Sequence, residues 1–287
     1  MTNRSTAVVF VTVLLGSVAD VDTGASQRAS AMQRTSEPGH YATVNGYRMY
    51  YEEYGSGRPL VLLHGGANTI HSSFESQVAE FARGHHVVAP EQIGHGHTAD
   101  VVGRPFSYRQ MAEDTASLLE RLNVHDADLV GWSDGGDLAL LIARYHPMLV
   151  RRLVISGANI RAEGMTSTKA LRELSDEDLA KALPASWREA YEPVSPDGPA
   201  HWTTFIGKSR LMWLTPIILE TTDLAVIQAP TLVVAGDHDA ITLDHTIEMF
   251  RALPHAQLLI LPGTPHATFQ SAARWLNPMM LEFFDKS

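Results

Sequence analysis

The segment Leu129-Val-Gly-Trp-Ser133-Asp-Gly-Gly-Asp-Leu-Ala-Leu140 runs from a short apolar stretch, through a serine between glycines, into a helical pattern. A serine in a Gly-x-Ser-x-Gly turn between a buried strand and a helix is held on a strained bend that exposes its Oγ. Gly131 and Gly135 leave room for the neighbouring strand and helix. The helix N-terminus favours negative charge developing beside the serine. The segment therefore predicts that Ser133 is a nucleophile.

The rest of the chain alternates between short apolar runs and amphipathic helical patterns. Residues 41–54 alternate and turn at Asn45-Gly46, which predicts an antiparallel hairpin. Runs typical of strands buried on both faces follow at 60–63, 86–89, 127–130, 153–156, 231–235 and 257–261. Helical spacing is found at 74–83, 108–122, 138–146, 242–253 and 269–284. This order predicts an α/β fold with a mostly parallel eight-stranded sheet covered by helices on both faces.

One region interrupts this alternation and predicts an inserted helical cap at 161–220. It has helical pieces without a convincing buried strand, and it holds three of the five tryptophans. The core is then expected to comprise 39–160 and 221–287, as one domain. Trp202, Phe205 and Trp213 are candidates for a substrate-binding wall, because such pockets are mainly apolar and aromatic. The alternative is that these aromatics only pack the cap onto the core.

The first residues resemble an export signal. A charged start is followed by an apolar run at 7–18, and Ser17-Val-Ala19 supplies the small residues that a signal peptidase needs. We expect a signal peptide at 1–19, a flexible lead at 20–38, and an exported, periplasmic or secreted bacterial protein. The apolar run is shorter than the roughly 20 residues that cross a bilayer, so no stable membrane anchor is expected.

The amino-acid composition limits the classes of partner that the chain is expected to bind. The chain has 22 Lys+Arg against 32 Asp+Glu, a net charge of −10, which is opposite to the basic footprint of nucleic-acid binding. Nucleic acid is therefore not expected as a partner, and a small-molecule substrate is. The sequence contains no cysteine, so the fold has no disulfides. No motif calls for a cofactor.

Candidate partners for the serine follow it in the chain. A serine hydroxyl needs a general base, and that base needs a carboxylate to orient it. Asp237 and Asp239 come at the end of one apolar run, and His266 comes just after the last. The carboxyl ends of parallel strands meet at one edge of a sheet, where ligands bind. We therefore expect His266 as base and one of the two aspartates as its acid.

A glycine-rich loop completes the predicted site. His64-Gly65-Gly66 follows an apolar run, and such a loop can direct a backbone N–H at a substrate oxyanion. We assign that donor to Gly66 and the second to the backbone N–H of Asp134, directly after the nucleophile. His64 is expected to support the loop by hydrogen bonding.

These motifs together resemble the α/β-hydrolase superfamily from about residue 41 to the C-terminus. The matching motifs are His64-Gly-Gly66, Pro90-Glu-Gln-Ile-Gly-His-Gly-His-Thr98, Gly131-Trp-Ser-Asp-Gly-Gly136, Gly236-Asp-His-Asp239 and Gly263-Thr-Pro-His266. In that family the aspartate three residues after the glycine usually serves as the acid, which implies Asp239 rather than Asp237. Glu91 and Thr98 depart from the usual pattern of their loop, with no expected effect on catalysis. His95 and His97 beside Glu91 could suggest a metal site, but the spacing lacks further convergent ligands, so no metal is expected.

A serine nucleophile implies an acyl-enzyme mechanism, and carboxylic ester hydrolysis is the function we expect. The Gly-Trp-Ser-Asp-Gly-Gly elbow is also similar to the valacyclovir-hydrolase-like branch, in which the aspartate after the serine is associated with a substrate amino group. That resemblance implies an alternative, an aminoacyl ester hydrolase or aminopeptidase-like enzyme that uses Asp134. A lactonase, a serine C–C hydrolase and a non-catalytic binding protein of the same fold remain further alternatives.

Overall fold

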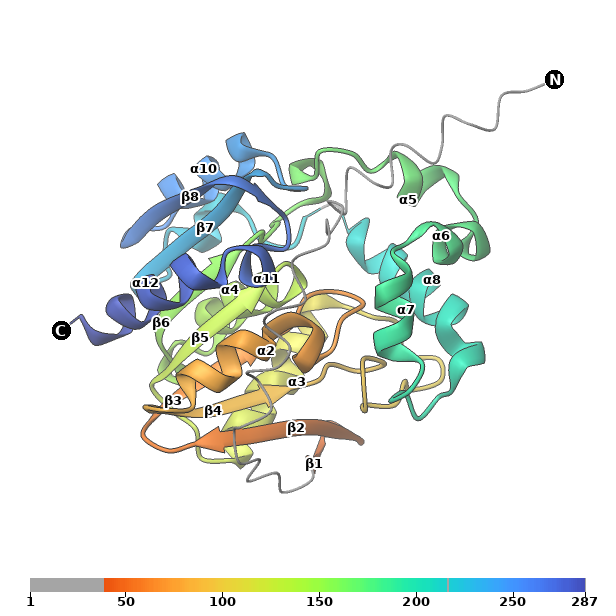
Figure 1. Cartoon of the computed structure of the whole chain (residues 1–287), viewed down its shortest axis with the longest axis horizontal. Helices are drawn as coiled ribbons and strands as arrows, with labels where there is room; N and C mark the ends of the chain where they lie inside the picture. Colours follow the sequence, from red (N-terminus) through yellow and green to blue (C-terminus); the bar gives the residue numbers. More distant parts are fainter. Residues whose placement is uncertain (1–38, 216, 287) are drawn as a thin grey trace.

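The computed structural model describes residues 39–215 and 217–286, so the predicted signal peptide (1–19) and lead (20–38) lie outside the described residues. Its centre is one eight-stranded sheet with strand order β1-β2-β4-β3-β5-β6-β7-β8 (Figure 1). The strands are β1 (His40–Val44), β2 (Tyr47–Gly55), β3 (Arg58–Leu63), β4 (His85–Pro90), β5 (Ala127–Trp132), β6 (Val150–Ser156), β7 (Thr231–His238) and β8 (Ala256–Pro265).

The strand directions match the expected pattern. β1 and β2 form an antiparallel hairpin, and β2 is also antiparallel to β4. All remaining neighbours are parallel. Asn45 and Gly46 both have positive φ, as a tight two-residue hairpin turn requires. The prediction of a mostly parallel eight-stranded sheet is confirmed.

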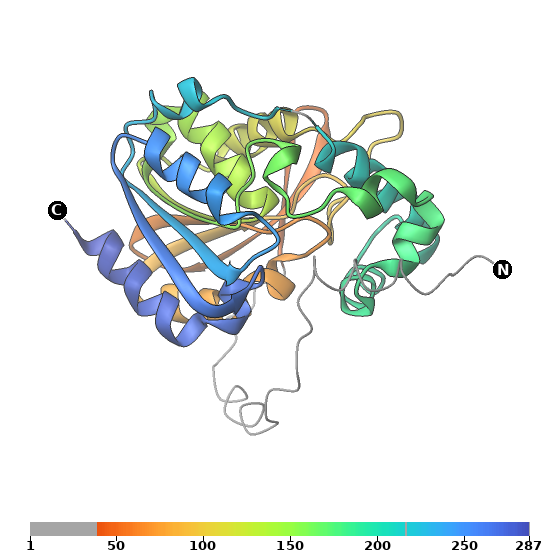
Figure 2. The same ribbon diagram turned by 90° about the horizontal axis from the view of Figure 1, so that it is seen from above.

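Helices cover both faces of the sheet (Figures 1 and 2). One face packs against α2 (Ile70–Phe81), α11 (Thr268–Ser271) and α12 (Ala273–Asp285), with Phe74, Phe81 and Phe284 fully buried between them. The other face packs against α3 (Tyr108–Arg121), α4 (Asp134–Tyr145) and α10 (Leu243–Ala252). Each face therefore has its own apolar core, which explains why the central strands are apolar throughout.

Two helix boundaries differ from the sequence pattern. Helix α2 begins four residues earlier than its apolar spacing predicts, because Thr69 and Ser72 form a capping box at its start. Phe74, where the prediction placed the start, has non-helical dihedral angles instead. The predicted helix at 269–284 is two helices, since the backbone leaves helical geometry at Ala272.

The region between β6 and β7 is a helical insert, as expected for the cap. It contains α5 (Lys169–Glu173), α6 (Asp176–Ala182), α7 (Ala185–Tyr191), α8 (Trp202–Trp213) and α9 (Thr221–Leu224), with short 3₁₀ turns at Ala162–Gly164 and Pro199–His201. Helices α5 to α8 stand beside the sheet as a separate layer (Figure 1). The insert returns to the core where the N–H groups of Ile218 and Leu219 both donate to Ile160 O. Among the described helices, none is long and apolar enough to cross a membrane.

Candidate active site

Ser133 lies on a strained turn between β5 and α4. Its backbone has φ 53° and ψ −122°, a conformation that a residue with a side chain adopts only under constraint. The turn is crowded: a Cβ at Gly131 would overlap the Gly135 carbonyl, and a Cβ at Gly135 would overlap the Leu63 carbonyl. The two glycines therefore allow β3, β5 and α4 to meet at the serine, and the predicted elbow geometry is present.

The structure brings Ser133, His266 and Asp239 together from three separate segments. His266 Nε2 lies 2.9 Å from Ser133 Oγ, and His266 Nδ1 lies 2.6 Å from Asp239 Oδ1. With its Nδ1–H donating to the carboxylate, the imidazole presents Nε2 as an acceptor for the serine O–H. Asp239 also accepts hydrogen bonds from the backbone N–H groups of Ile241 and Gly236, so its position is well defined.

The electrostatics of this pair suit a base. Burial alone would lower the pKa of His266, but the charge and hydrogen bond of Asp239 outweigh burial and raise the pKa above its usual value. Burial would likewise raise the pKa of Asp239, yet His266 and two backbone N–H groups hold it below its usual range. Asp239 is therefore ionised and able to stabilise an imidazolium at His266.

Asp237, the other candidate acid, lies elsewhere. Its side chain is 37% exposed and its Oδ1 accepts a hydrogen bond from the backbone N–H of Thr264. No bond joins it to His266. The choice of Asp239 over Asp237 thus has a geometric basis.

The loop after β3 is held in a defined orientation. Gly65 O accepts hydrogen bonds from His64 Nδ1 at 2.9 Å and from Asn68 N at 3.3 Å. His64 Nε2 in turn accepts from Gln92 N at 3.0 Å, and burial lowers the pKa of His64, so the ring is neutral. His64 therefore supports the loop.

The orientation of this loop has a consequence for Gly66. The described chain has no cis peptide bond, and in a trans peptide the C=O and the following N–H point in opposite directions. With Gly65 O turned toward His64 and Asn68, the Gly66 N–H points away from them. Within the described residues this N–H donates to no other group, and Gly66 lines the same pocket as Ser133.

A pocket of about 100 Å³ lies over Ser133. Its core side is formed by Gly66, Tyr108, Asp134, Asp137, Asn159 and His266, together with Ala240 and Ile241. Its cap side is mainly apolar and includes Met165, Leu171, Leu179, Leu183, Trp187 and Trp213. The cap therefore covers a small, mostly apolar space above Ser133.

Of the three aromatic residues predicted to form the pocket wall, only Trp213 lines this pocket. Trp202 is 3% exposed and donates to Ala180 O, while Phe205 is fully buried and stacks on Tyr191. Both pack into the apolar core toward the N-terminal part of α8, whereas Trp213 meets the pocket at the C-terminal end of the helix. The surroundings of Trp202 and Phe205 therefore match the alternative in which these aromatic side chains only pack the cap onto the core.

The Asp134 side chain joins the elbow to the cap. Its Oδ1 accepts from Tyr108 OH and its Oδ2 from Trp213 Nε1, both at 2.9 Å. Nearby, Asp137 is 2% exposed and accepts from Asn159 N at 2.6 Å. Burial raises the pKa of both carboxyl groups, and the neighbouring Asp134 adds to the rise at Asp137. Sequence reasoning missed Tyr108, Asp137 and Asn159, whose role depends on contacts between distant segments.

His95 and His97 point in different directions. His97 pairs with Glu91, whereas His95 is buried beside His64 and Phe205. In residues 39–215 and 217–286, no group of three or more His, Cys, Asp or Glu is arranged to hold a metal ion.

The strained serine at the end of a central parallel strand, with a histidine and a carboxylate at neighbouring strand ends, defines the class of hydrolases with an α/β core. The chain belongs to the alpha/beta hydrolase family, whose sequence signature matches residues 60–278. The expected superfamily and fold are thereby confirmed.

Individual relatives differ in the reactions that their names describe. The chain is 28% identical over 262 residues to 2-hydroxymuconate semialdehyde hydrolase of Pseudomonas putida, covering 83% of this chain and 91% of the relative. It is 26% identical over 250 residues to serine hydrolase BPHL of Mus musculus, covering 84% of each. A solved meta-cleavage product hydrolase from Pseudomonas fluorescens superposes with a TM-score of 0.71 at 22% identity, covering 86% of this chain and 97% of that one. These likenesses establish a hydrolase fold without fixing the bond that is cleaved.

Proposed function

We propose that this chain is a serine hydrolase that cleaves small carboxylic esters through an acyl-enzyme. The observation that carries the proposal is the 2.9 Å contact between Ser133 Oγ and His266 Nε2, with Asp239 on the far side of the imidazole. This arrangement activates a hydroxyl nucleophile, and the cap leaves space above it for a small substrate.

The proposed reaction has two steps. Ser133 Oγ attacks the ester carbonyl while His266 takes the hydroxyl proton, and the N–H groups of Gly66 and Asp134 hold the oxyanion. His266 then gives its proton to the leaving alcohol. In the second step His266 takes a proton from water as its oxygen attacks the acyl carbonyl, and then returns that proton to Ser133 Oγ as the carboxylic acid leaves.

The lining of the pocket favours neutral or cationic esters over anionic substrates, because it offers acceptors and no cation. Asp134 and Asp137 line the pocket, and no Lys or Arg is among the lining residues. A substrate carboxylate would approach two carboxyl groups without a compensating cation. For this reason we rank ester cleavage above the C–C bond cleavage of a carboxylate such as a hydroxymuconate semialdehyde, the substrate named for one relative.

An aminoacyl ester is the second candidate, and the acceptor-rich core side of the pocket favours it. Besides the two carboxyl groups, Asn159 Oδ1 is buried without a hydrogen-bond partner among the described residues. An ammonium group could donate to these acceptors and would favour the ionised form of Asp134.

The test is a hydrolysis panel with purified protein. We expect turnover of short p-nitrophenyl esters, and loss of several orders of magnitude in Ser133→Ala and His266→Ala. A fluorophosphonate should label the unmodified protein at Ser133, which separates an enzyme from a binding protein. Near-normal ester turnover in folded Ser133→Ala would refute the proposal.

The same panel separates the two candidates. Pairs of esters that differ only in an α-amino group compare the neutral and cationic forms directly, and lactones test the lactonase alternative. Asp134→Asn should remove any preference for the amino ester while leaving neutral ester turnover largely intact.

A further inference from the structure

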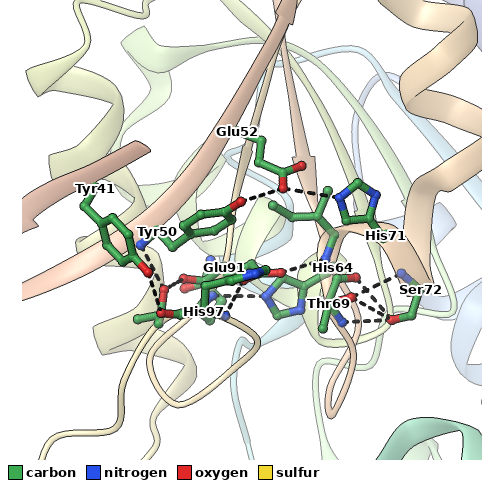
Figure 3. Close-up of polar contacts among 12 residues, drawn as sticks. Tyr41, Tyr50, Glu52, His64, Thr69, His71, Ser72, Glu91 and His97 are labelled. Atoms are coloured by element: carbon green, nitrogen blue, oxygen red, sulfur yellow. Dashed lines mark hydrogen bonds and ion pairs between the residues drawn. The ribbon is translucent and has the colours of Figure 1, made fainter. Parts of the chain in front are cut away.

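A buried carboxylate lies between the loop that carries Gly66 and the loop after β4 (Figure 3). Glu91 is fully buried, directly after the last residue of β4. Its Oε1 accepts a hydrogen bond from Ile70 N at 3.2 Å. Its Oε2 accepts from His97 N at 2.6 Å and from His97 Nδ1 at 2.9 Å.

The contact with Ile70 places this carboxylate at the start of α2. Ile70 is the first residue of the helix, where backbone N–H groups lack partners within the helix and negative charge is favourable. Ile70 is also only four residues after Gly66. A displacement of the helix start is therefore transmitted directly into the short loop that orients the Gly66 N–H.

The next residue holds the other end of the same loop. Gln92 N donates to His64 Nε2, and the His64 ring fixes Gly65 O. Gln92 thus holds the beginning of the 64–70 segment through His64, and the adjacent Glu91 holds its end through Ile70. Between these points Asn68 Nδ2 donates to Gly66 O at 2.8 Å.

Glu91 needs a charge partner to remain buried, since an ionised carboxylate away from water is costly. No Lys or Arg forms an ion pair with it within the described residues, and His97 occupies that position with its side chain 31% exposed. The loop is shaped for this contact: a Cβ at Gly96, which has φ 51°, would overlap the Glu91 carboxylate.

We propose that Glu91, paired with His97, is a positioning residue for the candidate oxyanion donor Gly66, acting through the start of α2. This inference rests on the proposed function and assigns a role to a residue that the sequence pattern treated as a neutral departure. An oxyanion donor acts mainly in the transition state, so misplacing it lowers kcat and leaves KM nearly unchanged.

Glu91→Gln tests this proposal because glutamine keeps the shape of the side chain. Its amide nitrogen cannot accept a hydrogen bond, so either the contact with Ile70 N or the contacts with His97 are lost. With p-nitrophenyl acetate we expect kcat about 10- to 100-fold lower and KM within about 3-fold of the unmodified protein. The rate of fluorophosphonate labelling at Ser133 should fall by the same factor as kcat.

Glu52→Gln is the matched control. Glu52 is a neighbouring buried carboxylate that accepts only from side chains, those of Tyr54 and of Tyr50 and His71 (the last two in Figure 3). His71 also lies on the first turn of α2, but its side chain is 60% exposed, so the loss of this contact leaves the Ile70 N–H where it is. The Glu52→Gln variant should lose about as much thermal stability as Glu91→Gln, while its kcat stays within about 3-fold of the unmodified protein. Equal losses of kcat in both variants, or an unchanged kcat in Glu91→Gln, would overturn the proposal.

If Glu91→Gln does not fold, His97→Gln provides the test, with an expected fall in kcat of about 3- to 10-fold at unchanged KM. An unchanged kcat there would overturn the proposal. Ester turnover that survives Ser133→Ala would instead refute the proposed function, whatever the result for Glu91. A protein that is labelled at Ser133 but does not turn over the ester still tests Glu91 through its labelling rate.

Discussion

Asp237 and Asp239 have contrasting surroundings although they are two residues apart. Asp239 is buried, bonded to His266 and to two backbone N–H groups, whereas Asp237 is partly exposed and accepts from Thr264 N in β8. The register of β7 explains the difference, since the strand bulges between Gly236 and His238 and directs the two side chains to different sides.

Replacement of each aspartate by asparagine should therefore give unequal results. Asp239→Asn is expected to lower kcat by roughly 10⁴, because the amide stabilises the wrong tautomer of the histidine. Asp237→Asn should change kcat by less than about 3-fold. Steady-state kinetics on both variants makes the comparison, and a reversed order would assign the acid role to Asp237.

The pKa of His266 predicts the pH dependence. The base must be neutral to accept the Ser133 proton, so kcat/KM should rise as the pH increases through the pKa of His266. Because Asp239 raises that pKa, the midpoint should lie above the usual histidine value of about 6.5. An ester without ionisable groups avoids substrate titration, and a midpoint clearly below 6 would contradict this assignment.

Helix α8 shows how one element divides its side chains between packing and the pocket. Trp213, at its C-terminal end, lines the pocket and donates to Asp134, while Trp202 and Phe205 join the apolar core. The helix is also tied to the core by Asp100, which pairs with His201 just before the helix and with Lys208 in its middle. The cap is therefore joined to the core at two places along α8.

Substitutions on α8 should separate into two kinds. Trp213→Phe is expected to change the ratio of kcat/KM between short and long esters by roughly 1–3 kcal/mol, and to cost about 1 kcal/mol of unfolding free energy because Asp134 loses a hydrogen-bond donor. Phe205→Ala should leave that ratio intact and cost about 3–5 kcal/mol of unfolding free energy. Thermal midpoints and ester-length profiles measured on both variants test whether the two residues have these different roles. An unchanged profile in Trp213→Phe would show that Trp213 does not determine the preference for ester length.

The contact between the loop after β4 and the start of α2 should make stability depend on pH. The hydrogen bond from His97 to Glu91 raises the pKa of His97, although burial opposes the rise. The pair therefore stabilises the fold fully below the usual histidine pKa, and this contribution is lost as the pH rises through the raised value.

His97→Gln should accordingly destabilise the protein more at about pH 5.5 than at about pH 8.5, by up to about 1 kcal/mol. Denaturant unfolding of both proteins at the two pH values measures the difference. An equal loss at both values would show that the His97 charge does not contribute.

For the chain in its entirety, export remains a prediction. The segment 1–19 has the composition of a signal peptide, with cleavage expected after Ala19. Intact-mass measurement of protein exported from a bacterial host should show a mature chain that starts near Asp20. Recovery of the full chain, starting at Met1, in the cytoplasm would refute export and leave the proposed enzymatic function unaffected.

Local patterns were sufficient for the architecture. Strand and helix periodicity, the Asn45-Gly46 turn and the elbow around Ser133 depend on neighbouring residues, so the sheet and the helical insert could be predicted without coordinates. The chain order of serine, acid and histidine also placed Ser133, Asp239 and His266 at strand ends that meet in the structure.

Other features required the assembled molecule. No spacing in the sequence distinguishes Trp213, which lines the pocket, from Trp202, which is buried in the core. The two residues are about three helical turns apart, so they project from nearly the same face of α8, and the packing of the cap decides which end of the helix meets the pocket. The contacts of Tyr108 with Asp134 and of Glu91 with Ile70 join segments more than 20 residues apart. Such contacts depend on how the elements are brought together in space, which the periodicity of a single element does not encode.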